Sequence, residues 1–359
     1  MIKVAHAILG FSPQIGGAEN QARLLVRNLC KEDIDVAVFT RRYGNDDITM
    51  DDSKIPVFRF WKASGFATKE LSAVAISIAL FRSRKQFDIF HVHQCNVLAF
   101  FVALVGSITK RPVVIKVANS GSKFDFSTLK ERLFGGIMLK YILRSKAQFV
   151  ALSEPIACAL EVNGVSSDRI TIIPNGVAIS DPDRQSSISS SVGFVGRLEA
   201  VKRPSILIEL APNFPECQFH LFGDGALRLK LEEEVSSRGI ENLTFYGEVF
   251  DLERIYDSVS FIVLPSLAEG MSNTLLESIV HGKACLVTDL PTNRATFRDS
   301  KSIVKYVDSD RASDWCAALS QLMDVPKKDI AYDRDQLIQY YNIGRVSSSY
   351  ISLYKKLLV

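Results

Sequence analysis

The sequence predicts an α/β protein that contains two doubly wound parallel sheets. Short β-branched and aromatic runs alternate with longer amphipathic stretches, and this rhythm occurs twice along the 359 residues. A stretch rich in Ser and Asp at 179–191 separates the two halves and has the composition of a linker. We therefore expect one domain at 1–183, a second at 191–344 and a terminal amphipathic helix within 345–359.

The elements follow one another in a regular order. The strands predicted for the first half are 3–9, 35–40, 56–60, 89–93, 113–117, 148–152 and 170–174. Helices are predicted between several of them, at 18–30, 69–84, 97–109 and 128–144. The second half contains strands that run into glycine turns at 191–198, 220–225 and 243–249, a strand at 261–264, and helices at 204–210 and 273–280. Such alternation favours parallel strands joined by crossover helices.

Composition excludes several classes of protein. The six cysteines show no metal-binding or disulfide spacing, which indicates a reducing compartment and no zinc site. Residues 1–9 read as a first buried strand because they lack the features of a secretion signal. The longest apolar runs, 71–81 and 96–108, are shorter than the ~18 residues of a membrane-spanning helix. The sequence thus predicts a cytoplasmic protein without a metal or other cofactor.

The most informative segment is 265–277, where Glu269 and Glu277 bracket a Gly-Met-Ser-Asn-Thr turn. The pattern predicts a strand, a turn and a helix, so the backbone N–H groups of 270–274 would lie at a helix N-terminus. Such a terminus binds phosphate or sugar hydroxyls, and Glu277 could accept hydrogen bonds from a ribose. The alternative interpretation is a surface helix whose acidic residues offset the helix dipole.

A second group of candidates follows the strand at 191–195. Arg197 and Lys202 supply two cations at a strand end, which suits a diphosphate. Glycines at successive strand ends, including Gly196 and Gly223, would let a base and a pyrophosphate approach the backbone. An ordinary turn is the alternative for the Gly-Asp-Gly sequence at 223–225.

Five segments together resemble a known family: Gly16-Gly17-Ala18-Glu19, Asn175-Gly176-Val177, Gly196-Arg197-Leu198 with Lys202, Gly223-Asp224-Gly225 and 269–277. In this order they resemble the retaining GT-B glycosyltransferases of family 4, the group 1 glycosyltransferases, over nearly the whole chain. The resemblance implies two Rossmann-like domains facing a cleft, with the C-terminal helix crossing back to the first. It also implies metal-independent transfer of a hexose-type unit, with retention, from a nucleoside-diphosphate sugar to a glycan or lipid-linked acceptor.

The resemblance also implies roles for individual residues. Arg197 and Lys202 would hold the diphosphate, Glu269 would contact the donor sugar, and Glu277 would contact the ribose. The turn residues would bind sugar hydroxyls and phosphate through their backbone; they are Gly270, Met271, Ser272, Asn273 and Thr274. In the first domain, Gly16 and Gly17 would allow close approach of donor phosphate or acceptor, and an ordinary glycine turn is the alternative.

The acceptor side departs from the family pattern. Many relatives carry a histidine after the strand that corresponds to 113–117, where this chain has Asn119 and Ser120. Neither side chain carries a proton near neutral pH, so catalysis would rest on stabilising the departing diphosphate. His91 and His93 lie on one strand face, and we expect a core position for His91 and a hydrogen bond at the cleft for His93.

The charge is unevenly distributed. Residues 1–180 carry a net charge of +8 and the remainder −5. Within the first half, the segment that contains the helix predicted at 128–144 has an apolar stripe with a cationic border, formed by Lys130, Arg132, Lys140, Arg144 and Lys146. Such a helix could lie peripherally on the anionic inner face of a membrane, or pack on its own sheet with a solvated basic rim. No nucleic-acid-binding module is recognised.

Two alternative functions remain at the level of sequence. One is a sugar-nucleotide epimerase of the same architecture, which would need more acid/base side chains than Glu269 and His93 supply. The other is a non-catalytic partner subunit, against which the intact Arg197, Lys202, Glu269 and Glu277 argue.

Overall fold

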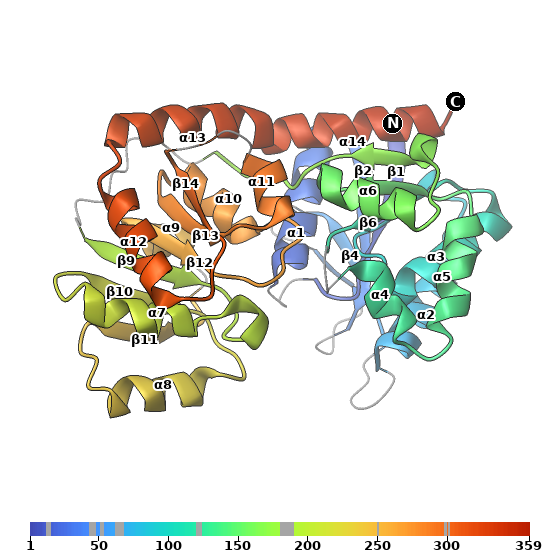
Figure 1. Ribbon diagram of the computed structural model, residues 1–359. Helices are drawn as coiled ribbons and strands as arrows, with labels where there is room; N and C mark the ends of the chain where they lie inside the picture. Colours follow the sequence, from blue (N-terminus) through green and yellow to red (C-terminus); the bar gives the residue numbers. More distant parts are fainter. Residues whose placement is uncertain are drawn as a thin grey trace. The chain divides into compact units, whose positions relative to one another are not determined.

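The computed structural model describes residues 1–11, 16–42, 48–50, 54–61, 68–119, 124–179, 190–249, 251–297, 300 and 302–359. The chain forms two compact units (Figure 1). Unit 1 contains residues 1–178 together with 342–359, and unit 2 contains residues 179–341. The chain therefore leaves unit 1, forms the whole of unit 2, and returns to unit 1 for its last helix.

Unit 1 is built on an eight-stranded sheet with the strand order β3-β4-β2-β1-β5-β6-β7-β8. All neighbouring strands are parallel except β3 and β4. The strands are β1 Ile2–Ala7, β2 Ile34–Arg41, β3 Ile48–Met50, β4 Pro56–Phe60, β5 Ile89–Val92, β6 Val113–Val117, β7 Gln148–Ala151 and β8 Ile170–Ile172. All residues of β5 and β6 are buried, as expected for strands covered on both faces.

The helices of unit 1 connect these strands in sequence order. They are α1 Gly17–Cys30, α2 Thr68–Arg82, α3 Val97–Thr109, α4 Asp125–Lys130, α5 Gly135–Arg144, α6 Glu154–Val162 and α14 Ile343–Leu357, with a short 3₁₀ turn at Ser167–Arg169. The terminal helix α14 packs on α1 and contributes Val346, Tyr350, Leu353 and Tyr354 to the core of the unit. The last segment of the chain is therefore part of the first unit's core.

One predicted helix of unit 1 is wrong in extent. The helix expected at 128–144 is two helices, α4 and α5, separated at Phe134, which has a left-handed backbone (φ 58°). Gly135 follows, and a Cβ there would lie 1.9 Å from the carbonyl oxygen of Leu129. The close approach of the two segments thus requires a glycine, and the chain bends where the apolar spacing alone predicts a continuous helix.

The loop containing Asn175-Gly176-Val177 anchors α14 within unit 1. The Gln21 side chain of α1 exchanges hydrogen bonds with the backbone N–H and C=O of Gly176. A Cβ on Gly176 would lie 2.6 Å from Ile343 Cδ1, so only glycine fits beneath the start of α14. Ile343 also donates its N–H to the carbonyl oxygen of Val177 at 3.0 Å. This motif therefore has a clear structural role.

Unit 2 is built on a fully parallel six-stranded sheet with the order β11-β10-β9-β12-β13-β14. The strands are β9 Ser191–Val195, β10 Gln218–Phe222, β11 Leu243–Gly247, β12 Phe261–Leu264, β13 Ala284–Thr288 and β14 Val304–Val307. The helices are α7 Ser205–Leu210, α8 Arg228–Ser237, α9 Leu252–Asp257, α10 Asn273–Val280, α11 Pro291–Phe297, α12 Ala312–Met323 and α13 Lys327–Tyr341, with 3₁₀ turns η3 Ala200–Lys202 and η4 Ala211–Asn213.

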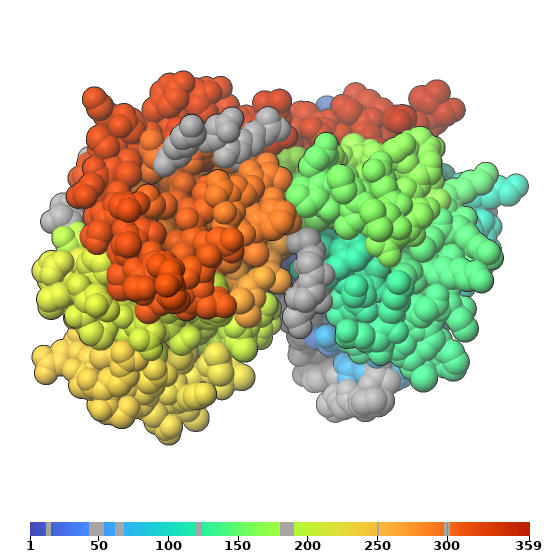
Figure 2. All heavy atoms as spheres, in the orientation of Figure 1, coloured from blue at the N-terminus to red at the C-terminus, as the bar shows by residue number. Residues whose placement is uncertain are grey.

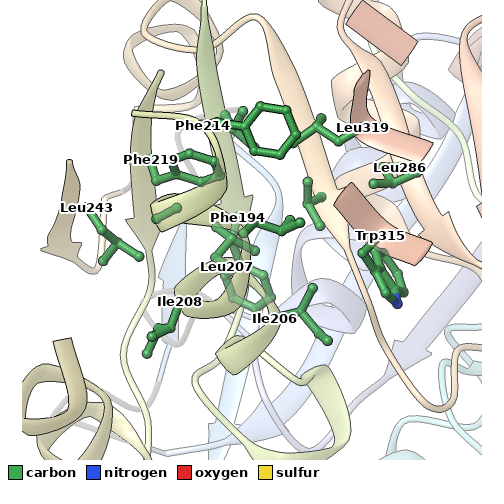
Figure 3. Close-up of a cluster of buried hydrophobic side chains, with 14 of the residues drawn as sticks. Phe194, Ile206, Leu207, Ile208, Phe214, Phe219, Leu243, Leu286, Trp315 and Leu319 are labelled. Atoms are coloured by element: carbon green, nitrogen blue, oxygen red, sulfur yellow. The ribbon is translucent and has the colours of Figure 1, made fainter. Parts of the chain in front are cut away.

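One apolar cluster of unit 2 lies between the sheet and the helices α7, α8 and α12. Figure 3 shows Phe194 and Phe219 from the strands, Leu207 from α7 and Trp315 from α12 within one apolar cluster. Burying such large side chains stabilises the unit by roughly 1.5–3 kcal/mol each. The predicted fold class, with two Rossmann-like parallel-sheet units, is confirmed.

No helix in the described part of the chain is long and apolar enough to span a membrane.

Candidate active site

The strand order of unit 2 places its candidate residues at one edge of the sheet. From β9 the chain proceeds to β10 and β11 on one side, and β12, β13 and β14 follow on the other. The order therefore reverses between β9 and β12. In open parallel sheets, ligands bind beyond the carboxyl ends of the strands at such a reversal point. The loops after β9 and β12 carry Arg197, Lys202, Glu269 and the turn at 270–274.

Two of the predicted glycines bring backbone segments into contact at this edge. The N–H of Gly196 donates to the carbonyl oxygen of Phe222 at 2.9 Å, and that of Leu198 donates to Asp224 at 2.9 Å. Gly223 has a left-handed backbone (φ +135°), and a Cβ there would lie 2.0 Å from the carbonyl oxygen of Gly196. The loops after β9 and β10 thus pack backbone against backbone, which only glycine permits at Gly223.

Lys202 and Glu269 come together as an ion pair. Lys202 Nζ lies 2.5 Å from Glu269 Oε1, and the two side chains are 25% and 13% exposed. The surrounding backbone supports this pair, because the N–H of Leu267 donates to the carbonyl oxygen of Val201 at 2.8 Å and Thr292 Oγ1 donates to that of Glu269 at 2.9 Å. A cation and a carboxylate are therefore held at the point where the sheet order reverses.

Arg197 lies apart from this pair. Its side chain is 71% exposed, and its guanidinium donates to Glu199 Oε1 at 2.6 Å. Glu199 belongs to the same loop as Arg197. The Arg197 side chain is therefore paired within its own loop and remains largely exposed to solvent. An exposed pair of this kind contributes little to stability.

The turn at 270–274 leads into α10. Ser272 caps the helix, since its Oγ accepts a hydrogen bond from the N–H of Leu275 at 3.3 Å. Gly270, Met271 and Ser272 are buried, whereas Asn273 and Thr274 are half-buried. The helix N-terminus predicted from the sequence is therefore present. The backbone N–H groups of its first turn follow Glu269 by a few residues in the sequence.

Glu277 lies one turn into α10 and its carboxyl group is enclosed. Burial raises the pKa of this carboxyl to about 7, because a charge is unfavourable away from water, while a hydrogen bond from Tyr256 acts in the opposite direction. Tyr256 OH lies 3.4 Å from Glu277 Oε2, and the Tyr256 ring stacks on His281 at 4.6 Å between centroids. Glu277 can therefore gain or lose a proton near neutral pH.

In unit 1, Gly16 and Gly17 form the start of α1. Gly16 has an extended backbone, and a Cβ on it would lie 2.3 Å from Glu19 Oε2. The Glu19 carboxylate thus lies close over the Gly16 backbone. The two glycines leave this helix N-terminus unobstructed by side chains of their own.

Asn119 is held by a carboxylate that sequence reasoning missed. Asn119 Nδ2 donates to Asp125 Oδ1 at 2.6 Å, and Asp125 Oδ2 accepts from the N–H groups of Ala118 at 3.1 Å and Cys95 at 3.4 Å. Burial raises the pKa of Asp125 to about 6, although these hydrogen bonds favour the charged form. Asp125 therefore ties together the loops that follow β5 and β6. Ser120 lies outside the described residues.

His93 lies in the interior of unit 1, where the expectation was a hydrogen bond at the cleft. Its ring is 2% exposed, and its Nε2 lies 2.9 Å from Nδ1 of His6 on the neighbouring strand β1. His91 is fully buried, as expected, and its Nδ1 lies 2.7 Å from the hydroxyl of Tyr354 on α14. Burial lowers the pKa of all three imidazoles, that of His6 to about 3.

These three histidines are the group of possible metal ligands in the described part of the chain, with ligand atoms within 4.8 Å of one another. The chemistry around them favours neutral rings. His6 and His93 share a hydrogen bond, and the nearby amine of Lys116 donates to Asn175 Oδ1 at 2.7 Å. Burial lowers the pKa of Lys116 to about 7.

The fold and the site define a glycosyltransferase of GT-B architecture. The model of glycosyl transferases group 1 matches residues 189–324, and that of the glycosyl transferase 4-like domain matches 16–176, so that the two cover most of the chain. The chain belongs to the group 1 glycosyltransferases, and the resemblance seen in the sequence is confirmed.

Individual relatives are distant in sequence and similar in length. An α-1,4-N-acetyl-D-galactosaminyltransferase of Campylobacter jejuni, named for a diphosphoundecaprenol-linked glycan, is 26% identical over 78% of this chain and 77% of its own. A UDP-Gal:α-D-GlcNAc-diphosphoundecaprenol α-1,3-galactosyltransferase of Escherichia coli is 24% identical over 83% and 82%. The structure of Anabaena HepE with UDP-glucose superposes with a TM-score of 0.81 at 16% identity, covering 99% of this chain and 100% of that one.

Proposed function

We propose that this glycosyltransferase moves a hexose-type unit from a nucleoside-diphosphate sugar to a lipid-linked saccharide. The observation that carries the donor side is the Lys202–Glu269 pair beside the N-terminus of α10, at the reversal point of the unit 2 sheet. The acceptor class is supported by the two relatives named for diphosphoundecaprenol-linked acceptors. The structural similarity to HepE with UDP-glucose is in keeping with a nucleotide-sugar donor.

The chemistry follows from the charges in unit 2. A bound diphosphate would replace Glu269 as the ionic partner of Lys202 and Glu199 as the ionic partner of Arg197. It carries more negative charge than a carboxylate and therefore attracts both cations more strongly. The two cations would then stabilise the charge that develops on the diphosphate as it departs. Glu269, released from Lys202, would accept hydrogen bonds from hydroxyls of the donor sugar. The acceptor hydroxyl would attack from the face that the diphosphate leaves, giving retention without a protein nucleophile.

The remaining donor contacts belong to α10 and its preceding turn. The N–H groups of 270–274 would bind sugar hydroxyls and phosphate, and the Glu277 carboxyl would contact the ribose. Gly196 and Gly223 would let the donor approach the loops after β9 and β10. In unit 1, Gly16, Gly17 and the amide of Asn119 are the acceptor-side candidates, and Asp125 is the residue that orients Asn119.

Transfer is favoured over the two alternatives. An epimerase would need a proton carrier that reaches the sugar, and the ring of His93 is buried against His6. A silent subunit would not need to retain Lys202 and Glu269 as a close pair. The relatives named above are transferases as well.

The decisive experiment offers the purified protein a panel of UDP-, GDP-, ADP- and dTDP-sugars without acceptor. The expected result is slow hydrolysis of one of them, which identifies base and sugar together. The Lys202→Ala variant is the control for contaminating hydrolases and should hydrolyse the same nucleotide sugar on the order of 10²-fold more slowly. Binding of none of these nucleotide sugars by calorimetry would refute the proposal.

We also propose that unit 1 associates peripherally with the inner, cytoplasmic face of a membrane. The apolar side chains of Leu133, Phe134 and Ile137, at the junction of α4 and α5, are 80%, 65% and 68% exposed. Lys130 and Lys140, on either side of them in the sequence, are exposed as well. The segment that contains α4 and α5 contributes to the teal and green surface in Figure 2. Apolar side chains with a cationic border are typical of surfaces that insert at an anionic bilayer, where a lipid-linked acceptor resides.

A further inference from the structure

We infer that Arg203 is a positioning residue that sets the place of Lys202 against the diphosphate of the donor. This inference rests on the proposed function, in which Lys202 is a diphosphate ligand. Arg203 follows Lys202 directly, at the end of the 3₁₀ turn η3. Its side chain is only 14% exposed and extends along the carboxyl edge of the unit 2 sheet.

The guanidinium of Arg203 connects the loop after β9 to the ends of three other strands. Its Nε donates to the carbonyl oxygen of Pro265, directly after β12, at 2.6 Å. One terminal nitrogen donates to Oγ1 of Thr288, the last residue of β13, at 3.1 Å. The other pairs with Asp310, which lies beyond β14. A single side chain thus joins the exits of β9, β12, β13 and β14, which are consecutive in the sheet.

The apolar part of the site supports this arrangement. The Arg203 guanidinium carbon lies 5.8 Å from the centroid of the Trp315 ring, and Trp315 is fully buried, with its Nε1 donating to the carbonyl oxygen of Ser309 at 2.8 Å. The planar cation therefore has a fixed aromatic neighbour in addition to three acceptors. Only arginine offers donors in a fork with this span, because a lysine ammonium is a single point.

The backbone of Arg203 is in a conformation that residues other than glycine adopt infrequently. Its φ of 48° and ψ of 50° are left-handed, a conformation that is unfavourable for a residue with a Cβ and that glycine adopts freely. A non-glycine residue in such a conformation near reactive groups is a common sign of a positional requirement.

Arg203 acts on Lys202 through the chain. Two bonds flank Lys202: Val201 accepts from the N–H of Leu267 at 2.8 Å, and Arg203 donates to Pro265 at 2.6 Å. Both partners belong to the segment that leads to Glu269. The distance between Lys202 and Glu269 is therefore set by two anchors, one on each side of the lysine, and Arg203 supplies the side-chain anchor.

The test is a double-mutant cycle with Arg203→Gly and Lys202→Ala, because glycine adopts the left-handed backbone without strain while the whole arginine side chain, with its guanidinium, is removed. The measurements are kcat and KM for hydrolysis of the nucleotide sugar identified by the panel, and Kd for UDP by calorimetry as a common probe. Arg203→Gly is expected to lower kcat about 10-fold with a small change in KM, and to cost nothing further in the Lys202→Ala background. Arg294→Ala is the matched control, since Arg294 is an exposed arginine paired with Asp289 near the end of β13.

The outcomes separate the inference from the proposed function. If Arg203→Gly lowers kcat by the same factor in the Lys202→Ala background as in the wild type, the two effects are additive and the positioning role alone is overturned. Full activity of Arg203→Gly would overturn it as well. Wild-type turnover in Lys202→Ala would overturn the diphosphate assignment and the positioning role with it. If Arg203→Gly does not fold, the same cycle is run with Arg203→Lys, which retains the charge and loses the fork, and which is expected to show the same non-additivity.

Discussion

Lys202 Nζ lies 2.5 Å from Glu269 Oε1, so the cation proposed for the diphosphate is paired with the carboxylate proposed for the sugar. The two side chains are each other's ionic partners. In the proposed function the donor replaces this pair, with its diphosphate binding Lys202 and its sugar binding Glu269. The pair therefore keeps both side chains oriented in a partly buried place where an unpaired charge would be unfavourable.

Removal of either diphosphate cation is expected to lower turnover far more than stability. Lys202→Ala and Arg197→Ala should each reduce kcat on the order of 10²-fold, because they meet charge that is greatest as the diphosphate departs. Steady-state kinetics on folded protein measures this, and Arg311→Ala, an exposed arginine of the same unit, is the control. Wild-type turnover in both variants would contradict the assignment.

The two carboxylates are expected to affect different ligands. Glu277→Gln should lower the affinity for the free nucleoside diphosphate. Glu269→Gln should leave that affinity nearly unchanged and should impair reaction of the complete sugar nucleotide. Calorimetric titration with the nucleoside diphosphate alone decides between them. Because the pKa of Glu277 is about 7, the wild-type affinity should also change between pH 6 and 8. This change should be smaller in Glu277→Gln, where titration of the ligand's own terminal phosphate remains. Equal affinity in wild type and Glu277→Gln would exclude the ribose role.

The buried histidines predict that unit 1 loses stability in mild acid. The pKa values of His6, His91 and His93 are lowered in the folded state, so the unfolded chain binds more protons below its own pKa of about 6.5. The free energy of unfolding should therefore fall as the pH drops from 6.5 toward 4, by up to about 1.4 kcal/mol per pH unit for each imidazole. The pKa of Asp125 is raised to about 6 in the folded state, so its protonation increases the free energy of unfolding as the pH falls from 6 to 4. This gain offsets the loss caused by one histidine.

Urea unfolding at pH 7 and pH 5, followed by a signal from unit 1, measures this dependence. His93→Gln should be less stable at pH 7 and should show a smaller loss between the two pH values. His220→Gln, at a half-exposed position in unit 2, is the matched control and should leave the dependence of unit 1 unchanged. The same loss in wild type and His93→Gln would show that other groups dominate.

The proposed membrane association through the α4–α5 segment should be sensitive to salt and to charge. Replacing Lys140, Arg144 and Lys146 by glutamine should release the protein from anionic vesicles, since each cation contributes roughly 1 kcal/mol near such a surface. Flotation with phosphatidylserine vesicles at low and moderate salt measures this, and attraction should weaken as the Debye length falls to about 10 Å. The control replaces three exposed lysines of unit 2: Lys230, Lys327 and Lys328. Absence of wild-type flotation at low salt would end the proposal.

The sequence predicted most elements of the fold because its strands have clear β-branched runs and its helices clear apolar spacing. It missed the break between α4 and α5, since Leu133 and Phe134 continue the apolar pattern while Gly135 contacts Leu129. It also named no strand at β3, β13 or β14 and no helix at α6, α8, α9, α11, α12 or α13. The break between α4 and α5 arises where a backbone contact overrides side-chain spacing.

Candidate residues that lie in one segment of the sequence could be predicted. Contacts between residues of distant segments could not. Glu269 and the turn after it precede a helix in the sequence itself. The partnership of His6 with His93, and the reach of Arg203 to Thr288 and Asp310, depend on which strands become neighbours in the sheet. That strand order is a property of the complete sheet, and no short segment of sequence contains it.

The return of the chain to unit 1 has a consequence for synthesis on the ribosome. Unit 2 is one continuous segment, whereas the core of unit 1 is completed only by Tyr350, Leu353 and Tyr354 of α14. At about 5–20 residues per second, the nascent sheet of unit 1 would wait on the order of 10–40 s for its last helix. During that interval its apolar face is open to chaperones. A chain that stops within α13 would carry a nearly complete unit 2 and a unit 1 whose core lacks α14.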